Sequence, residues 1–305
     1  MNLSYTDEQN LLRDSVSKFC GSDYDFETRM KSVNSDHGHN PEHWKLFAEL
    51  GWLAIPFSEE LGGLDGGDVD LSLMFEEFGK SIVVEPYLAN VVLSGGVLKR
   101  SDLENKTEII EQLIAGERQV SLANYEPQKG FNLNSVDCEI SEDGSVSGLK
   151  TTVLNAPNAD LFLVFGKHQA GHAFALISKD AEGSKVTSYK TYDGFVSGDL
   201  HLENCKASAV FSKSDALDIL NQAILEGIIC VSSEAIGAME TCYKLTIEYT
   251  QQREQFGQSL SKFQALQHRM VDMFMETEFS KSFLLKVLAT DDENERTKLI
   301  YGLKN

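Results

Sequence analysis

The chain has 305 residues, of which 42% are hydrophobic and 24% charged, a composition typical of globular proteins with a sizeable core. Asp and Glu outnumber Lys and Arg by 47 to 27, and the resulting net charge of −20 argues against binding to nucleic acid or to an anionic membrane surface. The sequence has neither a secretory signal nor an apolar run of the roughly 18 residues that a span needs, so we expect no membrane insertion.

The first third of the sequence predicts helices. Thr6 and Gln9 form a capping-box pattern ahead of apolar residues at helical spacing. Asn40-Pro41 is typical of an N-cap followed by proline at the first helical position, and we expect Gly51 to end that helix. Helical spacing continues over residues 71–78, 86–97 and 103–114. We therefore predict an N-terminal helical domain over residues 1–118.

From about residue 120 the chain changes to short runs of apolar residues separated by turn residues. The clearest runs are residues 136–140, 162–165, 174–177 and 199–202. Short strands at this spacing favour a sandwich or a small barrel. We predict a middle β-sandwich or barrel domain over residues 119–213.

After Ser214 the pattern is helical over a long stretch that Gly257 interrupts. The second helix carries an apolar stripe of Phe263, Leu266, Met270, Met273, Phe279 and Phe283. Long adjacent helices indicate a bundle, but two helices leave a broad apolar face uncovered. Residues 214–305 are therefore predicted to form a C-terminal helical bundle that is incomplete, which makes the fold class α+β.

The C-terminal helices also differ in charge from the rest of the chain. Residues 241–305 hold nine basic and nine acidic residues, which makes this the best place for a phosphate-rich ligand. Arg253 lies where the first long helix ends, beside Gly257 and the start of the second helix. An anion site and a surface salt bridge are both compatible with an arginine in this position.

Other chemical signatures are weak. The sequence contains no GxGxxG or GxxxxGK[ST] motif. We interpret His37, His39 and His43 as solvated surface side chains, because no carboxylate stands at ligand spacing, and we predict no metal site. Five dispersed cysteines without a CxxC pair predict a reduced, cytoplasmic protein.

Several segments taken together resemble the acyl-CoA dehydrogenase family. They are Arg253-Glu254-Gln255-Phe256-Gly257, Phe263-Gln264-Ala265-Leu266-Gln267-His268-Arg269, Thr6-Asp7-Glu8-Gln9, Glu59-Glu60-Leu61-Gly62-Gly63, Glu126-Pro127, Ala159-Asp160 and Ala235-Ile236-Gly237-Ala238-Met239-Glu240. The resemblance covers nearly the whole chain and implies an acyl-CoA dehydrogenase-like fold. Details such as Tyr24-Asp25-Phe26 and Glu85-Pro86-Tyr87-Leu88 look closest to small subunits of pimeloyl-CoA dehydrogenases, which are expected to pair with a related large subunit.

The resemblance implies FAD as cofactor, extended between the strand domain and the C-terminal helices. The positions that match the family's FAD contacts are Leu122, Asn124, Tyr125, Gly130, Phe131, Thr152, Leu154, Arg253, Gln255, Phe256, Phe263 and Gln264. Arg253 matches the arginine that reaches the FAD pyrophosphate of a neighbouring subunit. Tyr125, Phe131 and Leu154 stand where most members carry threonine, serine and threonine, departures that affect flavin tuning rather than fold.

The activity implied by the resemblance is FAD-dependent α,β-dehydrogenation of an acyl-CoA thioester, in fatty acid or dicarboxylic acid degradation, with electron-transferring flavoprotein as acceptor. The chemistry needs a carboxylate that removes the α-proton. One family placement of this base falls on Gly227, one residue from Glu226. Glu226 is therefore the candidate catalytic base, with a structural or solvated role as the alternative.

Three interpretations of the function follow from the resemblance. The chain is either a catalytic dehydrogenase subunit or a non-catalytic, FAD-holding or structural partner of a chain that does the chemistry. A third interpretation keeps the fold with another substrate, as in nitroalkane- or oxygen-using relatives. In each case we expect an oligomer, with a related large subunit or with a second copy of this chain.

Overall fold

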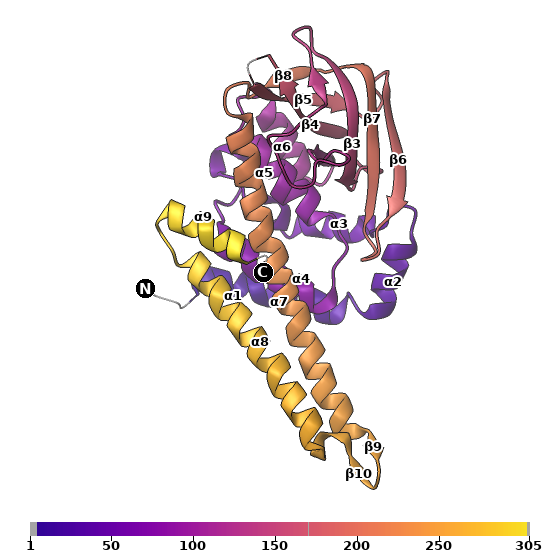
Figure 1. Ribbon diagram of the computed structural model, residues 1–305, viewed down its shortest axis with the longest axis vertical. Helices are drawn as coiled ribbons and strands as arrows, with labels where there is room; N and C mark the ends of the chain where they lie inside the picture. Colours follow the sequence, from indigo (N-terminus) through magenta and orange to yellow (C-terminus); the bar gives the residue numbers. More distant parts are fainter. Residues whose placement is uncertain (1–4, 170, 304–305) are drawn as a thin grey trace. The chain divides into compact units, whose positions relative to one another are not determined.

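The computed structural model describes residues 5–169 and 171–303, which divide into two compact units (Figure 1). The helical unit contains residues 5–29, 67–83 and 228–303, and the mixed unit contains the described residues of 30–66 and 84–227. The domain boundaries expected near residues 118 and 213 both fall inside the mixed unit, so the three-domain division stays a prediction.

The predicted order of helices, then strands, then helices is confirmed, and with it the α+β fold class. The helices are α1 (Asp7–Ser22), α2 (Phe26–Asn34), α3 (Pro41–Glu49), η1 (Trp52–Ala54), η2 (Glu59–Leu61), α4 (Asp68–Ser81), η3 (Leu88–Ser94), α5 (Gly95–Arg100), α6 (Lys106–Ile114), α7 (Ala216–Gln252), η4 (Leu260–Lys262), α8 (Gln264–Leu288) and α9 (Glu293–Gly302). The strands are β1 (Val120–Ala123), β2 (Glu139–Ile140), β3 (Ser145–Leu154), β4 (Leu161–His168), β5 (Gly171–Ser178), β6 (Ser184–Lys190), β7 (Val196–Lys206), β8 (Ala209–Phe211), β9 (Glu254–Gln255) and β10 (Gln258–Ser259).

Helix ends follow the capping residues that the sequence indicates. The Thr6 hydroxyl accepts a hydrogen bond from the Gln9 amide, and the Gln9 side chain accepts one from the Thr6 amide, which completes the capping box of α1. Asn40 caps α3, and Gly51 follows its end with a φ of 74°. The helix predicted over residues 86–97 differs in type, because its first part is the seven-residue π-helix η3.

The strands of the mixed unit form one connected sheet in the order β6-β7-β3-β2-β4-β5-β8, with β1 parallel to β4. β3 and β7 are antiparallel, and their register shifts between Lys150 and Val153. Apolar side chains from β1, β3, β4, β5 and β7 form the buried core beside this sheet, including Ala123, Val146, Phe162, Val164 and Leu200. The register shift matters for the site, because it falls at Thr152.

Two helices of the helical unit approach each other to backbone contact. A Cβ atom on Gly79 of α4 would lie 1.9 Å from the Glu234 carbonyl oxygen of α7. A Cβ atom on Gly237 of α7 would lie 1.9 Å from the Glu76 carbonyl oxygen of α4. Glycine is therefore the only residue type that permits this crossing without a shift of the backbone.

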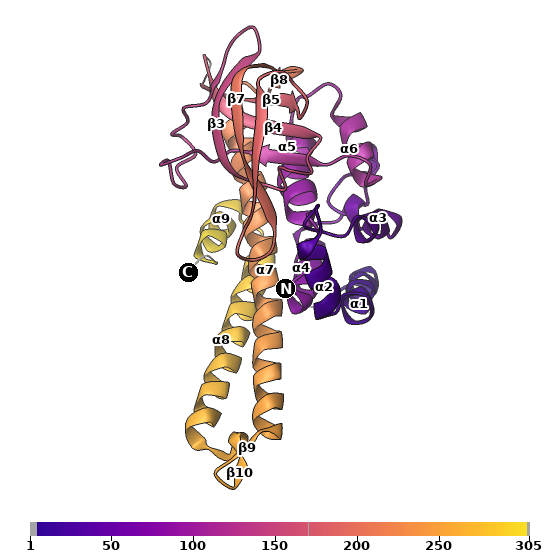
Figure 2. The same cartoon turned by 90° about the vertical axis from the view of Figure 1, so that its right-hand side faces the viewer.

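In the helical unit, α7 and α8 run side by side as a long hairpin, as Figures 1 and 2 both show. Large apolar side chains of this hairpin are exposed, namely Leu245, Tyr249, Val271, Phe274, Met275 and Phe279. The uncovered apolar face that the sequence indicates is thus present, and it contains Leu266 and Phe279 of the predicted stripe together with Val271, Phe274 and Met275. An exposed apolar surface of this kind marks a contact with another chain or segment.

One described helix, α7, is long and apolar enough to cross a membrane by length and composition alone. Polar and charged residues such as Glu226 and Glu234 interrupt this helix, so it is not the uninterrupted apolar run considered from the sequence, and the absence of membrane insertion stays a prediction. Half of the most apolar window of α7 is buried inside the structure, and a core helix passes the same test.

We predict that Gly79→Ala lowers the free energy of unfolding by about 1–3 kcal/mol, because the added methyl group meets the Glu234 carbonyl oxygen. Denaturant unfolding measures the change. Gly21→Ala is the matched control, since no described atom lies within 4 Å of its Cβ position. Alanine there should stabilise α1 by up to about 1 kcal/mol. Equal stability of Gly79→Ala and wild type would contradict the close crossing.

Candidate functional site

The predicted cofactor residues of the mixed unit lie on two segments that the structure brings together. The first continues from β1 through Asn124 to Phe131, and the second is the end of β3. The Ser121 hydroxyl donates a hydrogen bond to the Leu154 carbonyl oxygen at 2.8 Å. The Thr151 amide donates one to the Tyr125 carbonyl oxygen at 2.9 Å. These two bonds fix the segments to each other along their length.

The π-helix η3 anchors the start of the first segment. The side-chain oxygen of Asn90 accepts a hydrogen bond from the Val120 amide at 2.6 Å, and the Ser94 hydroxyl donates to the Val120 carbonyl oxygen at 2.8 Å. Both side chains belong to fully buried residues. The wider π-helical turn presents Asn90 and Ser94 on one side of the helix, and such turns recur at functional sites. Sequence periodicity gave no signal for either residue.

Thr152 has an unusual backbone conformation at the register shift of β3. Its φ is 52°, in the left-handed region that a β-branched residue disfavours. The Thr152 amide donates hydrogen bonds to the Tyr189 hydroxyl and to Asp199, both at 3.2 Å, and the Tyr189 hydroxyl donates to the same Asp199 oxygen at 3.0 Å. Tyr189 and Asp199 therefore hold Thr152 in a strained conformation.

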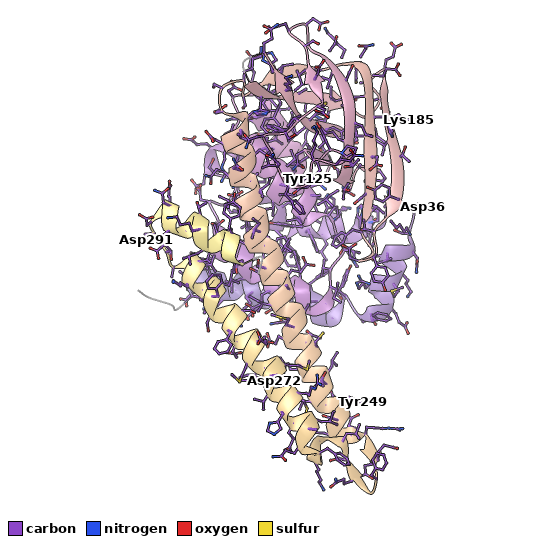
Figure 3. The ribbon with its side chains drawn as sticks, in the orientation of Figure 1. Asp36, Tyr125, Lys185, Tyr249, Asp272 and Asp291 are labelled. Carbon is purple, nitrogen blue, oxygen red and sulfur yellow. The ribbon has the colours of Figure 1, made fainter. Side chains whose placement is uncertain are left out.

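An aromatic pair replaces small polar residues on the first segment. The rings of Tyr125, labelled in Figure 3, and Phe131 meet edge to face with centroids 6.0 Å apart. Phe131 is 85% exposed, whereas burial raises the pKa of the Tyr125 phenol and keeps it protonated at neutral pH. On the second segment, Leu154 offers only its backbone carbonyl. Tyr125, Phe131 and Leu154 therefore replace the small hydroxyl side chains that the resemblance leads one to expect at these three positions.

The remaining predicted cofactor residues form a separate cluster at the tip of the α7–α8 hairpin, where Figure 3 labels Tyr249 on α7. β9 and β10 pair through a two-residue turn of Phe256 and Gly257, whose φ values are 54° and 78°. Phe256 is 91% exposed, and its ring meets Phe263 edge to face. Gln255 and Gln264 are also exposed.

Arg253 stands beside this turn with its charge available. Its backbone is fixed by hydrogen bonds to Tyr249 and Leu260. Its exposed guanidinium forms no ion pair or hydrogen bond with any residue that the structure describes. The surface salt bridge considered from the sequence is therefore not seen within the described chain. An unpaired arginine beside a strained, exposed aromatic residue favours the alternative, an anion site.

Glu226 is held by two cations of α5. Its carboxylate accepts hydrogen bonds from Lys99 at 2.9 Å and from Arg100 at 2.5 and 3.2 Å. Burial raises the pKa of Glu226, but the hydrogen bonds and charges of Arg100 and Lys99 outweigh this effect and leave the pKa below its ordinary value. A general base needs the opposite shift. The catalytic role stays a prediction, and the ion pairs weigh toward the structural alternative.

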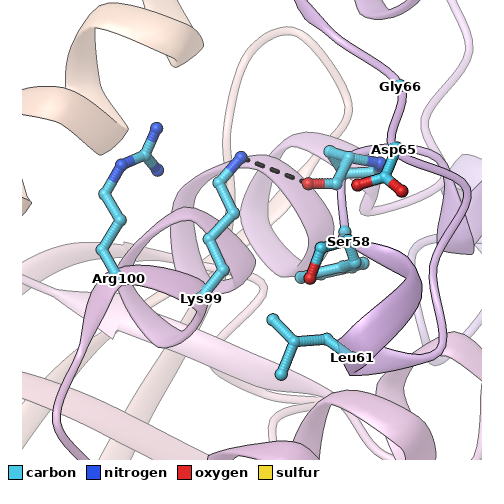
Figure 4. A pocket seen from close by; sticks show the side chains of 8 residues that line it. Ser58, Leu61, Asp65, Gly66, Lys99 and Arg100 are labelled. Carbon is cyan, nitrogen blue, oxygen red and sulfur yellow. Dashed lines mark hydrogen bonds between the residues drawn. The ribbon is translucent and has the colours of Figure 1, made fainter.

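Lys99 and Arg100 also line a cavity of about 310 Å³ (Figure 4). Within it, Lys99 donates a second hydrogen bond, to the Pro56 carbonyl oxygen at 3.3 Å, and Asp65 contributes a carboxylate. Both cations pair with Glu226, so neither offers an uncompensated charge to the cavity.

Position 227, the family's alternative place for the base, holds no side chain. A Cβ atom on Gly227 would lie 2.9 Å from a methyl carbon of Leu93 in η3. Leu93 therefore fills the space that a side chain at position 227 would need.

The interpretation of the histidines as solvated side chains holds for the exposed His37 and was wrong for His39 and His43. His39 is only 3% exposed, and burial lowers its pKa. His37 contacts Asn158 at 3.1 Å, and His43 contacts the buried Glu85 at 3.0 Å. His37 ties the loop before α3 to Asn158, and His43 ties α3 itself to Glu85. Within the described residues, no group of three or more His, Cys, Asp or Glu side chains has the arrangement of a metal site.

Two family models of known proteins match most of the chain. Residues 6–117 match the family model "Acyl-CoA dehydrogenase, N-terminal domain", and residues 217–304 match "Acyl-CoA dehydrogenase, C-terminal domain". A relative from Bacillus subtilis (strain 168), the probable acyl-CoA dehydrogenase YngJ, is 26% identical over 96% of this chain and 82% of its own length.

Solved structures give the same fold. The ChsE4-ChsE5 complex from Mycobacterium tuberculosis matches with a TM-score of 0.86 and 23% identity, over 98% of this chain and 83% of that chain. A glutaryl-CoA dehydrogenase from Mycobacterium smegmatis, solved in complex with FADH2, matches with a TM-score of 0.87 and 22% identity, over 97% of this chain and 80% of that one.

We predict that Glu226→Gln lowers stability by about 2 kcal/mol at neutral pH, because Lys99 and Arg100 lose their counter-charge. The pKa of Glu226 is lower in the folded chain than in the unfolded chain. The carboxylate therefore stabilises the fold fully above its ordinary pKa, and this contribution is lost as the pH falls through the lowered value. The difference in the free energy of unfolding between variant and wild type should therefore become smaller as the pH falls.

Denaturant unfolding at several pH values measures this difference. Glu49→Gln is the control, because the pair of Glu49 with Lys45 is exposed and should contribute less than about 1 kcal/mol. A stability difference for Glu226→Gln that stays constant with pH would rule out the ion pairs as its cause.

Proposed function

Because the chain belongs to the acyl-CoA dehydrogenase family, we propose that it is a subunit of an FAD-dependent enzyme that oxidises an acyl-CoA thioester at its α and β carbons. The observation that carries this proposal is the tip of the α7–α8 hairpin. There an unpaired Arg253 and a strained, exposed Phe256 form a preorganised element without a partner in the described chain. Such an element is complete only when an anionic ligand or another chain meets it.

The residues at the hairpin tip fit the phosphate end of FAD. The Arg253 guanidinium is permanently charged and presents parallel donors that match two phosphate oxygens. Gln255 and Gln264 are exposed amides that offer further hydrogen bonds, while Phe256 and Phe263 offer aromatic faces. We propose that these side chains hold the FAD of a neighbouring chain. When bound, FAD would supply the acceptor for the hydride that leaves the substrate.

The residues of the mixed unit fit the flavin ring less well. The segments around Tyr125 and Leu154 lie together, as a flavin-binding surface requires, but Leu154 has no hydroxyl to place at the reactive edge. The Thr152 amide already donates to Tyr189 and Asp199, and the Leu154 carbonyl oxygen already accepts from Ser121. The chain therefore retains a surface for the ring while lacking the side-chain hydroxyl that most family members use.

These departures favour a second candidate function, a non-catalytic FAD-holding partner. Glu226 is neutralised by Lys99 and Arg100, and Leu93 fills the space beside Gly227. In this alternative, Arg253 completes the cofactor site of a related large subunit. The large subunit then supplies the base. The similarity of fold to the ChsE4-ChsE5 complex is compatible with a heteromer.

The exposed apolar face of the α7–α8 hairpin supports an oligomer under either alternative, with a related large subunit or a second copy as the covering chain. The proposal includes a cytoplasmic location, electron-transferring flavoprotein as acceptor, and fatty or dicarboxylic acyl-CoA as substrate class. Sedimentation of a stable, FAD-loaded monomer would contradict it.

We predict that Arg253→Ala weakens FAD retention by on the order of 2–5 kcal/mol, since a cation that contacts the pyrophosphate is removed. The flavin absorbance per assembly, measured after gel filtration, reports retention. Arg269→Ala, which removes the same charge from α8, is the matched control and should keep its flavin. Equal flavin content in the Arg253→Ala and wild-type assemblies would contradict a phosphate contact.

Turnover of thioesters separates the candidate functions. If this chain is catalytic, the chain purified alone with FAD should reduce an artificial electron acceptor when acyl-CoA is added, and Glu226→Gln should slow flavin reduction by roughly 10²–10⁴. If it is a partner subunit, turnover should need the large chain and should survive Glu226→Gln. Oxidation of a nitroalkane, without thioester turnover by either preparation, would favour the third interpretation.

A further inference from the structure

Among the described residues of the mixed unit, Lys150 of β3 and Glu126 form a fully enclosed ion pair. We propose that Lys150 is a positioning residue that acts through Glu126 to fix the loop of residues 127–137, which carries Gly130 and Phe131. The side chains of Lys150 and Glu126 are 0% and 3% exposed, and their charged atoms lie 2.6 Å apart. The role in cofactor binding rests on the function proposed above, whereas the role in loop geometry does not.

Glu126 joins both ends of the loop to β3. One carboxylate oxygen accepts hydrogen bonds from Lys150 at 2.6 Å and from the Cys138 amide at 3.0 Å. The other oxygen accepts from the Asp137 amide at 2.6 Å. Glu126 stands at the beginning of the loop, and the two amides stand at its end. A single carboxylate therefore closes the loop, and Lys150 sets where that carboxylate lies.

The pair also lies between the two segments of the candidate site. Tyr125 directly precedes Glu126, and Thr152 follows Lys150 by two residues. Between them, the Thr151 amide donates a hydrogen bond to the Tyr125 carbonyl oxygen at 2.9 Å. A displacement of the ion pair would therefore move Tyr125, the loop and the strained Thr152 together.

The surroundings of each group in this cluster determine whether it is ionised. Burial alone would raise the pKa of Glu126, but Lys150 and the two loop amides lower it below its ordinary value, so the carboxylate is ionised. Burial raises the pKa of the neighbouring Cys138 thiol to about 11, so that group is neutral. Glu126 is therefore the counter-ion of Lys150.

Stability alone does not explain an enclosed ion pair. Replacing both charged side chains at such a site often leaves the stability of a protein unchanged or raises it, because the desolvation of two ions costs as much free energy as their attraction gains. Unlike an apolar contact, an ion pair restricts the orientation of both side chains, because the ammonium group must meet a carboxylate oxygen that also accepts a hydrogen bond from a loop amide. The arrangement thus holds the base of the loop, while Phe131 at its tip stays exposed.

The test compares Lys150→Met, which leaves Glu126 charged and alone, with the double variant Glu126→Gln/Lys150→Met, which removes both charges at similar volume. Lys129→Met is the matched control, because it removes the partly exposed Lys129 from its pair with the exposed Asp137 in the same loop. Each assembly is measured for its denaturation midpoint, for hydrogen exchange of the Asp137 and Cys138 amides, and for FAD affinity by fluorescence titration.

We expect Lys150→Met to lower the denaturation midpoint and the double variant to recover much of it. In both variants the two amides should exchange at least tenfold faster, and FAD should bind at least tenfold more weakly, whereas Lys129→Met should match wild type. A double variant with recovered stability, wild-type exchange and wild-type FAD affinity would show that the pair only fills space, and would overturn the proposal.

Two further outcomes are decisive. If the double variant does not fold, Lys150→Arg keeps the charge but moves it, and wild-type exchange and FAD affinity in that variant would overturn the proposal. If the wild-type assembly binds no FAD, the proposed function fails. The exchange rates of Asp137 and Cys138 then decide the positioning of the loop by themselves.

Discussion

The cost of burying a carboxylate organises the mixed unit. A carboxylate taken out of water must gain cations or amide donors in exchange, or its burial opposes folding. Glu126 gains Lys150 and two backbone amides, and Glu226 gains Lys99 and Arg100. Glu85 is buried against His43. Each pairing joins segments that are distant in sequence, so the same requirement that neutralises the charges also fixes the geometry of the site.

This requirement has a chemical consequence. A carboxylate that is stabilised by two cations has little affinity for a proton, and proton affinity is what α-proton abstraction demands. The structural use of Glu226 and its use as a base therefore compete for the same lone pairs. In an assembly of related chains this conflict disappears when one chain carries the cation-bound carboxylate and the other carries the base.

Local signals in the sequence were sufficient for most of the fold. The Thr6 capping box, Asn40-Pro41 and Gly51 mark helix ends because they act within one or two turns of the chain. The π-helix over Leu88–Ser94 could not be distinguished, since its apolar spacing resembles that of an α-helix. The burial of His39 was also missed, because a polar loop does not reveal what packs over it.

The site was predictable only where it depends on short motifs. Arg253 and Phe256 stand in one continuous segment, so their proximity follows from chain connectivity. The pairing of Glu126 with Lys150 spans 24 residues, and the contact of Glu226 with Arg100 spans 126, so neither follows from spacing. The strain at Thr152 depends on a register shift between two strands, which is a property of the sheet and not of either sequence alone.

The two-residue turn at Phe256 and Gly257 limits how the α7–α8 hairpin can change over evolution. Both residues of this two-residue turn are in the left-handed region. One inserted residue would therefore disrupt the pairing of β9 with β10 and make the position of Arg253 less well defined. Ligand binding would then cost the conformational entropy of ordering Arg253 and the turn. The length of the link between the two long helices is therefore constrained by the pairing of β9 with β10.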